Sequence, residues 1–337
     1  MALGRPVFVV GSPRTGTTLA KEILNRHPRI HLLDEVHFFE RILDDRARLG
    51  DLSEDASLDR AIERIRWIVA EYGSDPLLAD VLGPDVYRDR VRAAGGDYRA
   101  LLEVLLRTGA DLKHADFWGD SSPQDILYLS TILRWFPDAR IVALIRDPRA
   151  FLASYKNYHR REVSTYRERY NPITNSLLWR SYMTALLEAR GEPWGAAVHE
   201  LRYEDLVADP EAHTRLLCDH IGVEYDPAMV VVDSANTSFG DEAASGTAAG
   251  IFTDSRDRWR TELTKTEVWI GERVFGGVME ELGFARSSRS GMLPPSLPET
   301  ARILSLIPVR LFNMLFRGLK PVRISKIRRV FTLFRRR

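Results

Sequence analysis

Cysteine is almost absent from this chain, whose 337 residues include only Cys218. A single cysteine excludes an intrachain disulfide and favours a reducing compartment. Long apolar runs are missing too, since no stretch approaches the roughly 20 residues that a transmembrane helix needs. No signal peptide is visible either, because β-prone residues begin almost at the start of the chain. These shortages predict a globular, cytoplasmic protein.

Short β-prone segments alternate with helical ones. This alternation predicts an α/β fold of the three-layer P-loop type, with a central parallel sheet covered by helices on both faces. Strands are expected at Val7–Val10, Ile30–Leu33, Arg140–Ile145 and Ala197–Leu201. Helices are expected at Thr17–Arg26, Leu58–Ala70, Tyr98–Leu106, Pro123–Phe136, Pro148–His159, Asn175–Ala189, Pro210–Ile221 and Thr266–Leu282.

The segments divide into one large domain and a tail. Residues 1–285 would form the domain, which includes a largely helical insertion at about 53–112. Residues 238–250 are small, polar and glycine-rich, which is typical of a mobile loop or lid. Residues 286–298 are expected to be a linker, because they are rich in serine and proline. Residues 299–337 would form basic C-terminal helices.

A phosphate-binding frame follows the first strand. Gly11 and Gly16 stand in the spacing G-x-x-x-x-G, and the glycines let the backbone approach an anion closely. The lysine that an ATPase or GTPase carries after the second glycine is missing, since Thr17 occupies its place, and Arg14 supplies a cation inside the loop instead. The residues expected to hold the anion are Ser12, Pro13, Arg14, Thr15, Gly16, Thr17 and Thr18.

A second basic position lies at the end of the strand Arg140–Ile145. Arg146 follows this strand, and Ser154 lies two turns along the next helix, for which Asp147 is the expected N-cap. Ligands of open α/β sheets bind where strands end, so Arg146 and Ser154 can converge on a second phosphate. The alternative is an arginine paired with Asp147 and a serine that faces the core.

Together these motifs resemble the sulfotransferases that use 3′-phosphoadenosine 5′-phosphosulfate. The loop is similar to the family's 5′-phosphosulfate loop, and Arg146 with Ser154 to its 3′-phosphate motif. The segment that begins at Leu201-Arg-Tyr-Glu-Asp-Leu resembles a Y-E-D-L segment, and the segment that begins at Ser255-Arg-Asp-Arg resembles a late basic segment. The resemblance thereby adds Tyr203, Ser255, Arg256 and Arg258 to the cofactor-binding residues. It implies this donor, release of adenosine 3′,5′-bisphosphate, a hydroxyl acceptor and no metal. The helical insertion at about 53–112 would recognise that acceptor; the alternative is that its apolar residues simply belong to the core.

The resemblance also implies a general base. The family places a catalytic glutamate where this chain has Glu35, within Asp34-Glu-Val-His-Phe-Phe39. Asp34 is the expected cap of a helix beginning there, and His37, the rival base, would point to a different side of that helix. Arg14 would stabilise charge on the leaving group of an in-line displacement. Arginine rather than lysine at this position favours the glutamate-dependent, bacterial-type branch over the cytosolic aryl branch.

One departure from the family pattern leaves alternatives open. Many relatives carry lysine in the segment that matches Gly119-Asp-Ser-Ser-Pro123, where this chain has Ser121. Arg14 alone, Lys113, His114 or a tail residue could compensate, or the protein could be a catalytically weak nucleotide binder. A P-loop kinase or NTPase is the enzymatic alternative. Trp118, Trp259 and Tyr203 are candidates to contact adenine.

The tail has a charge of its own. Residues 299–337 contain 11 of the 48 basic residues and one of the 47 acidic residues, which gives them a net charge of +10. Residues 1–298 contain the other 37 basic and 46 acidic residues, a net charge of −9. Apolar residues interleave with this charge, and Pro308 is expected to kink or split the helix. An anionic membrane surface is one expected partner, and packing on the catalytic domain or on a second subunit of a homodimer is the other. Nothing in the remaining sequence supports nucleic-acid binding.

Overall fold

A wholly parallel five-stranded sheet forms the centre of the computed structural model, which describes residues 4–72, 78, 81–160, 170–232, 256–287 and 293–316. The strands lie in the order β2-β3-β1-β4-β5. Their bounds are β1 Pro6–Gly11, β2 Ile30–Leu33, β3 Phe117–Asp120, β4 Arg140–Ile145 and β5 Val198–Arg202. The order reverses at β1, so the carboxyl ends of β1 and β4 meet at a topological switch point, where ligands of such sheets bind.

Successive residues of each strand face opposite sides of the sheet, and both sides are buried. In β1, Val7 and Val9 pack with Ile23 of α1 and Leu217 of α13. Phe8 and Val10 belong to the larger core on the other face, which contains α7, α11 and α15. The predicted three-layer α/β fold is therefore confirmed.

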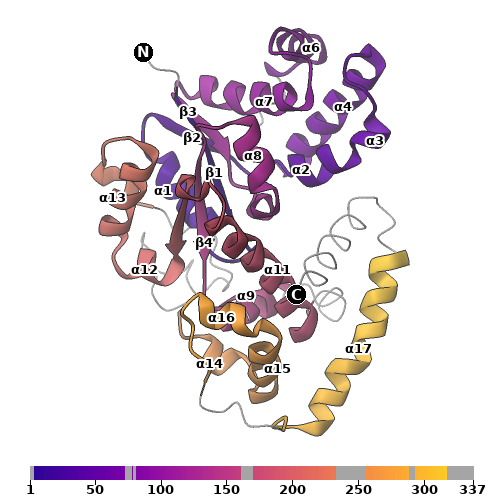
Figure 1. Cartoon of the computed structure of the whole chain (residues 1–337), viewed down its shortest axis with the longest axis vertical. Helices are drawn as coiled ribbons and strands as arrows, with labels where there is room; N and C mark the ends of the chain where they lie inside the picture. The colour runs from indigo at the N-terminus through magenta and orange to yellow at the C-terminus, as the bar shows by residue number, and fades with distance from the viewer. Residues whose placement is uncertain are drawn as a thin grey trace.

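The helices form three groups around the sheet (Figure 1). One end carries α2 Phe38–Arg41, α3 Arg46–Leu49, α4 Asp55–Tyr72, α6 Pro84–Ala93, α7 Tyr98–Leu112 and α8 Leu129–Trp135. The other helices that cover the sheet are α1 Thr17–Asn25, α9 Pro148–Arg160, α11 Pro172–Arg190, α12 Tyr203–Ala208 and α13 Pro210–Ile221. The end opposite α6 carries α14 Trp259–Glu262, α15 Lys265–Phe275 and α16 Gly277–Glu281. From that end α17 Leu297–Phe316 runs upward along one side of the molecule in Figure 1. Within these described residues, no helix is both long enough and apolar enough to cross a bilayer.

Four details of the fold differ from the sequence-based expectations. The strand β3 was not predicted; its Gly119 lies so close to β1 that an added Cβ would sit 1.7 Å from the Val7 carbonyl oxygen. The expected helix Thr266–Leu282 is divided at Gly276, whose φ of 59° ends α15. The expected helix Pro123–Phe136 begins as a 3₁₀ helix over Pro123–Tyr128. Pro308 lies inside α17 and does not split it, whereas the expected kink stays a prediction.

Two histidines at the edge of the sheet make stability depend on pH. The rings of His199 of β5 and His220 of α13 have centroids 5.3 Å apart and are tilted by 36°. Burial, together with the neighbouring His199 and Arg140, lowers the pKa of His220 to about 4. A depressed histidine pKa stabilises the folded state above the unfolded pKa of about 6.5, and this stabilisation is lost as pH falls toward 4.

We therefore expect the melting temperature to fall between pH 7 and pH 4, and to fall less in His220→Gln. Glutamine keeps a donor for the Ile141 carbonyl oxygen, which lies 3.2 Å from His220 Nε2, but it does not titrate. The measurement is a series of thermal melts of both proteins across this range. Parallel curves for the two proteins would show that His220 does not contribute.

Candidate active site

The loop between β1 and α1 is a tight turn held by a hydrogen bond of its own. Thr15 Oγ1 donates to the Ser12 carbonyl oxygen at 2.6 Å, and both residues are fully buried. Arg14 and Gly16 have φ values of 70° and 102°, a region that favours glycine at Gly16 and is unusual for arginine. A Cβ at Gly16 would lie 2.4 Å from Tyr203 Cδ2, so only glycine fits against the tyrosine ring.

The helix α1 begins directly after this loop, with Gly16 as its N-cap. Among the described residues, no side chain caps its first turn, and none of the first-turn residues is acidic. The N–H groups of Thr17 and Thr18 in the first turn therefore face the loop. Together with the positive end of the helix dipole, they create a positive potential there. Such an arrangement favours a phosphate-type anion.

Three sequence-predicted residues from separate elements meet beside the loop. Arg146, at the end of β4, donates from Nη1 to the Arg14 carbonyl oxygen at 3.1 Å. Arg14 Nε lies 3.5 Å from Ser154 Oγ of α9. Arg146 and Ser154 are 6% and 2% exposed, and burial lowers the pKa of both guanidinium groups, Arg14 and Arg146. Both stay charged at neutral pH because arginine begins from a very high pKa.

The first residues of α12, which follows β5 directly, contact this cluster. The Arg146 guanidinium lies 4.1 Å from the ring centroid of Tyr203. Glu204 Oε1 accepts from the Asp147 backbone N–H at 2.9 Å, and burial raises the pKa of Glu204. The Asp147 carboxylate in turn accepts from the Arg149 backbone N–H at 2.8 Å, as expected for the N-cap of α9. The Y-E-D-L segment therefore fixes the turn that carries Arg146.

The other nucleotide-binding candidates lie in different surroundings. Trp118 and Trp259 belong to the larger hydrophobic core and are 2% and 5% exposed, whereas Tyr203 touches the loop. Arg256 and Arg258 precede α14, which packs against the Ser154 helix α9. Ser255 and the glycine-rich segment 238–250 lie outside the described residues.

Glu35 follows β2 and stands in a row of titratable side chains. Its Oε2 lies 3.2 Å from His37 Nε2, and His37 Nδ1 lies 3.2 Å from Glu40 Oε1. The Glu35 side chain is 46% exposed, whereas those of His37 and Glu40 are buried. The negative charge of Glu35 raises the pKa of Arg14, against the larger effect of burial, so the carboxylate is within electrostatic range of the loop.

Two predictions for this segment are wrong. The helix α2 begins only at Phe38, with His37 as its N-cap at a φ of 53°. Asp34 therefore caps no helix and instead forms an ion pair with Lys21 of α1. Because His37 lies outside the helix, its ring turns toward Glu35 rather than to a different side.

A buried carboxyl group behind Glu35 was not predicted. Asp120, at the end of β3, accepts from Ser122 Oγ at 2.5 Å, and Ser122 Oγ also lies 3.3 Å from the His37 backbone nitrogen. Burial raises the pKa of Asp120 to about 7, although the hydrogen bond from Ser122 and the nearby His37 oppose the shift. Among the described residues, no group of three or more His, Cys, Asp or Glu could hold a metal ion.

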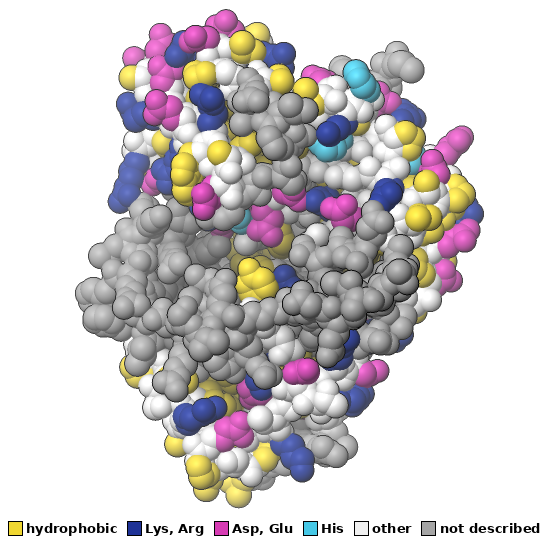
Figure 2. All heavy atoms as spheres, turned by 180° about the vertical axis from the view of Figure 1, so that it is seen from behind, with side chains coloured by type: hydrophobic (Ala, Val, Ile, Leu, Met, Phe, Trp, Pro, Cys, Tyr) yellow, Lys and Arg dark blue, Asp and Glu magenta, His cyan; other side chains and the backbone are white. Residues whose placement is uncertain are grey.

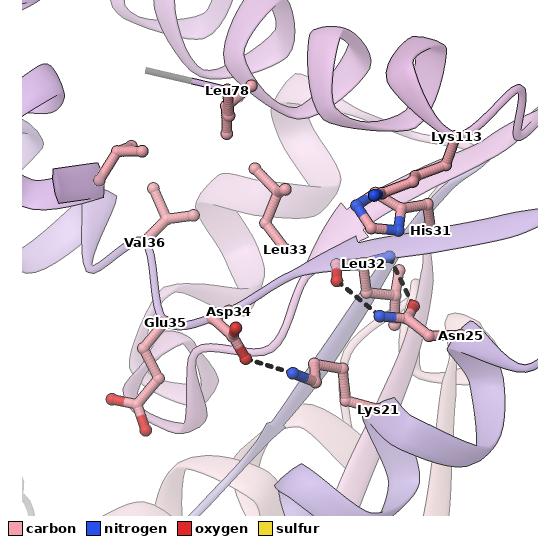
Figure 3. Close-up of a pocket in the computed structure, with 11 residues that line it drawn as sticks. Lys21, Asn25, His31, Leu32, Leu33, Asp34, Glu35, Val36, Leu78 and Lys113 are labelled. Atoms are coloured by element: carbon pink, nitrogen blue, oxygen red, sulfur yellow. Dashed lines mark hydrogen bonds and ion pairs between the residues drawn. The ribbon is translucent and has the colours of Figure 1, made fainter. Parts of the chain in front are cut away.

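A pocket of about 200 Å³ opens next to Glu35 along the edge strand β2 (Figure 3). One wall is apolar, and Val69 and Leu78 of the helical insertion contribute to it. The opposite wall is polar, and α1 supplies Lys21 and Asn25 to it. Asn25 bonds both the N–H and the carbonyl oxygen of Leu32, at 2.8 and 2.9 Å, so its amide covers the free edge of the sheet. The sequence did not predict that Lys21 and Asn25 line a pocket. They follow Thr17 by four and eight residues, so a helix places them on the same face as the loop residue, and this spacing is the signal that could have indicated their position.

The expected substitutes for the family lysine are not next to the base. Ser121 is buried at the end of β3, and its N–H donates to the Leu33 carbonyl oxygen at 3.0 Å. Lys113 lies beside His31, at the opposite end of the pocket from Glu35 (Figure 3). His114 follows Lys113 and is exposed. Lys21, paired with Asp34, is closer to Glu35 in the same pocket, and this pairing raises its pKa despite the opposing effect of burial.

Known proteins share this sequence pattern and this fold. The chain is 24% identical over 229 residues to protein-tyrosine sulfotransferase 1 of Danio rerio, covering 66% of this chain and 55% of the relative. It is 26% identical over 312 residues to nodulation protein NoeE of Sinorhizobium fredii, covering 83% and 66%. An uncharacterized protein of Aquifex aeolicus is 23% identical over 260 residues, which cover 76% of this chain and 30% of that protein. The chain thus spans between about a third and two thirds of the length of these relatives.

The structural comparison agrees with the sequence comparison. The sulfotransferase domain of the Synechococcus PCC 7002 olefin synthase superimposes with a TM-score of 0.55 at 21% identity, covering 84% of this chain and 96% of that domain. The model of the sulfotransferase family matches residues 6–227, which contain the loop, Glu35, Arg146, Ser154 and Tyr203. The chain belongs to the sulfotransferase family.

Proposed function

We propose that this chain transfers a sulfuryl group from 3′-phosphoadenosine 5′-phosphosulfate to a hydroxyl acceptor. The observation that carries the proposal is the meeting of Arg14, Arg146 and Ser154 beside the glycine loop. The buried guanidinium of Arg146 and the partly buried one of Arg14 repel one another, and a bound anion would offset that cost. The proposed donor is charged at two separate positions, the 3′-phosphate and the 5′-phosphosulfate, and it can therefore occupy both Arg146 and the loop.

At the sulfur atom the reaction forms one bond and breaks one, and a proton moves from the acceptor to the base. The acceptor oxygen attacks the sulfur, the bond between the sulfur and the bridging oxygen of the 5′-phosphate breaks, and adenosine 3′,5′-bisphosphate leaves. Glu35 takes the proton of the acceptor hydroxyl as general base. Arg14 stabilises the charge that develops on the bridging and leaving oxygens, and the loop N–H groups add to this stabilisation.

His37 and Glu40 support the proposed base rather than replace it. His37 is buried, with a carboxylate oxygen 3.2 Å from each of its ring nitrogens. A ring held between two carboxylates cannot also reach an acceptor freely, whereas the half-exposed Glu35 carboxylate can. His37 therefore positions Glu35 for proton transfer, and Glu40 positions His37.

The pocket beside Glu35 is the proposed acceptor site, and the helical insertion would supply its apolar wall. An acceptor with an apolar part and a reactive hydroxyl fits a pocket with one apolar and one polar wall. Small metabolites, glycans and lipid headgroups are the candidate acceptors. The similarity to a protein-tyrosine sulfotransferase adds tyrosine-containing peptides.

The test is a transfer assay with sulfur-labelled donor, without Mg²⁺, on a panel of these acceptor classes. We expect label in at least one hydroxyl acceptor, with one equivalent of adenosine 3′,5′-bisphosphate released per transfer. Tight nucleotide binding without transfer to any acceptor would favour the catalytically weak nucleotide binder that Ser121 suggests. Mg²⁺-dependent cleavage of ATP would favour the kinase or NTPase instead.

A further inference from the structure

The helix α17 is attached to the domain at two points, both at the start of another helix. Asn171, which caps α11, donates from Nδ2 to the Ile303 carbonyl oxygen at 3.0 Å. Thr264, which caps α15, donates to Glu299 Oε1 at 2.7 Å. Ile303 is 5% exposed. One face of α17 therefore packs on the domain, as expected if an apolar face of the tail were buried there.

The outward side of α17 carries an apolar stripe of its own, beside the exposed polar residues Arg302 and Ser305. Leu297, Ala301, Leu304 and Pro308 follow one another at intervals of four, three and four residues, so they form a single stripe along the helix. All four are exposed, with Leu297 at 69% and Leu304 at 49%. Helices that lie on a protein surface normally turn polar residues outward. We call these four residues the outer stripe.

The charge of residues 299–337, which include all of the outer stripe except Leu297, favours one kind of partner. Residues 299–337 carry a net charge of +10, whereas basic and acidic side chains are interspersed over the described surface in Figure 2. A second copy of this chain on the stripe would bring two such segments together, against their mutual repulsion. A nucleic acid would attract the charge but would leave the leucines in water. A bilayer that contains anionic lipids satisfies both features.

We propose that the outer stripe of α17 lies in the surface of an anionic bilayer and holds the domain there. Leu297 and Leu304 would enter the boundary between headgroups and acyl chains, and the net positive charge of residues 299–337 would attract the anionic lipids. The attachment of α17 to the caps of α11 and α15 would then fix the orientation of the domain on the membrane. This role does not depend on the reaction that the domain performs.

The test is co-sedimentation of the full chain with vesicles of phosphatidylcholine and phosphatidylserine at roughly three to one, close to a cytoplasmic leaflet in charge. We expect the parent protein to bind, and Leu297→Ser/Leu304→Ser to bind at least about 10-fold more weakly, because two leucines lose their apolar burial. Binding should also weaken steeply with salt and with vesicles of phosphatidylcholine alone.

A matched control uses two equally exposed apolar residues elsewhere. Leu216 and Val231 lie outside α17 and are 48% and 61% exposed. The variant Leu216→Ser/Val231→Ser loses similar exposed apolar surface, and we expect its vesicle binding to stay within about 2-fold of the parent. Thermal melts of both variants would establish that they fold. Equal vesicle binding by the parent and the stripe variant would overturn the proposal. It would also be overturned by a parent dimer in solution that binds no vesicles and that the stripe variant abolishes, since a second copy would then cover the stripe.

Discussion

Glu35→Gln is expected to reduce turnover by about 10²-fold or more, because glutamine cannot accept the proton of the acceptor hydroxyl. The affinity for adenosine 3′,5′-bisphosphate should stay within about 2-fold of the parent, since the substitution changes one charge and little volume. Glutamine can still meet His37 Nε2, which lies 3.2 Å from the carboxylate, so the local structure should persist. Steady-state turnover and calorimetric titration of the bisphosphate give the two quantities.

Two further variants make this result specific. Glu188→Gln removes an exposed carboxylate of α11 and should leave turnover unchanged. His37→Asn removes the ring between Glu35 and Glu40, and it should lower turnover less than Glu35→Gln does, because the base remains. If Glu35→Gln is as active as the parent while His37→Asn is inactive, then the histidine is the base and the assignment to Glu35 is wrong.

Arg149→Met is expected to lower the free energy of unfolding by about 3–5 kcal/mol, the usual cost of removing one partner of a buried ion pair. Arg149 is 8% exposed; its Nη2 lies 2.7 Å from Asp147 Oδ2, and its Nη1 lies 3.1 Å from Glu272 Oε1. Glu272 is completely buried in α15, so its charge would lose its basic partner. Urea denaturation of the parent and the variant measures the difference.

The double variant Arg149→Met/Glu272→Gln distinguishes lost charge pairing from lost packing. Glutamine keeps an oxygen for the Ser287 N–H, which donates to Glu272 at 2.9 Å, and it carries no charge. We expect the double variant to recover more than about 1 kcal/mol relative to Arg149→Met. A single variant as stable as the parent would contradict the claim that this pair joins α9 to α15.

The sequence was sufficient for the features that depend on local pattern. Alternation of β-prone and helical segments predicted the parallel sheet. Two parallel strands need a crossover connection between them, and this connection is usually a helix that covers one face of the sheet. The glycine spacing and the polar residues after β1 and β4 predicted which side chains would gather, because carboxyl ends of neighbouring parallel strands meet at one edge. Arg14, Arg146 and Ser154 do lie together at that edge.

The features that the sequence did not predict depend on long-range contacts. β3 has only four residues, two of them glycine and aspartate, and it is a strand because β1 and β2 pair with both of its edges. Asp34 looked like a helix cap, but Lys21 of another element binds it. His37 adopts a left-handed conformation that histidine rarely takes, so no periodicity could place its ring beside Glu35. The exposure of the outer stripe likewise appears only once Ile303 is known to face inward.

The central claim is that Arg14 and Arg146 bind the two charged ends of one nucleotide. Calorimetric titration without Mg²⁺ should show that adenosine 3′,5′-bisphosphate binds at least about 10-fold more tightly than ATP or the 5′-monophosphate. Arg146→Ala should weaken the bisphosphate by a similar factor and the 5′-monophosphate much less, because only the former carries a 3′-phosphate. Equal losses for both nucleotides, or tighter binding of ATP by the parent, would contradict the account.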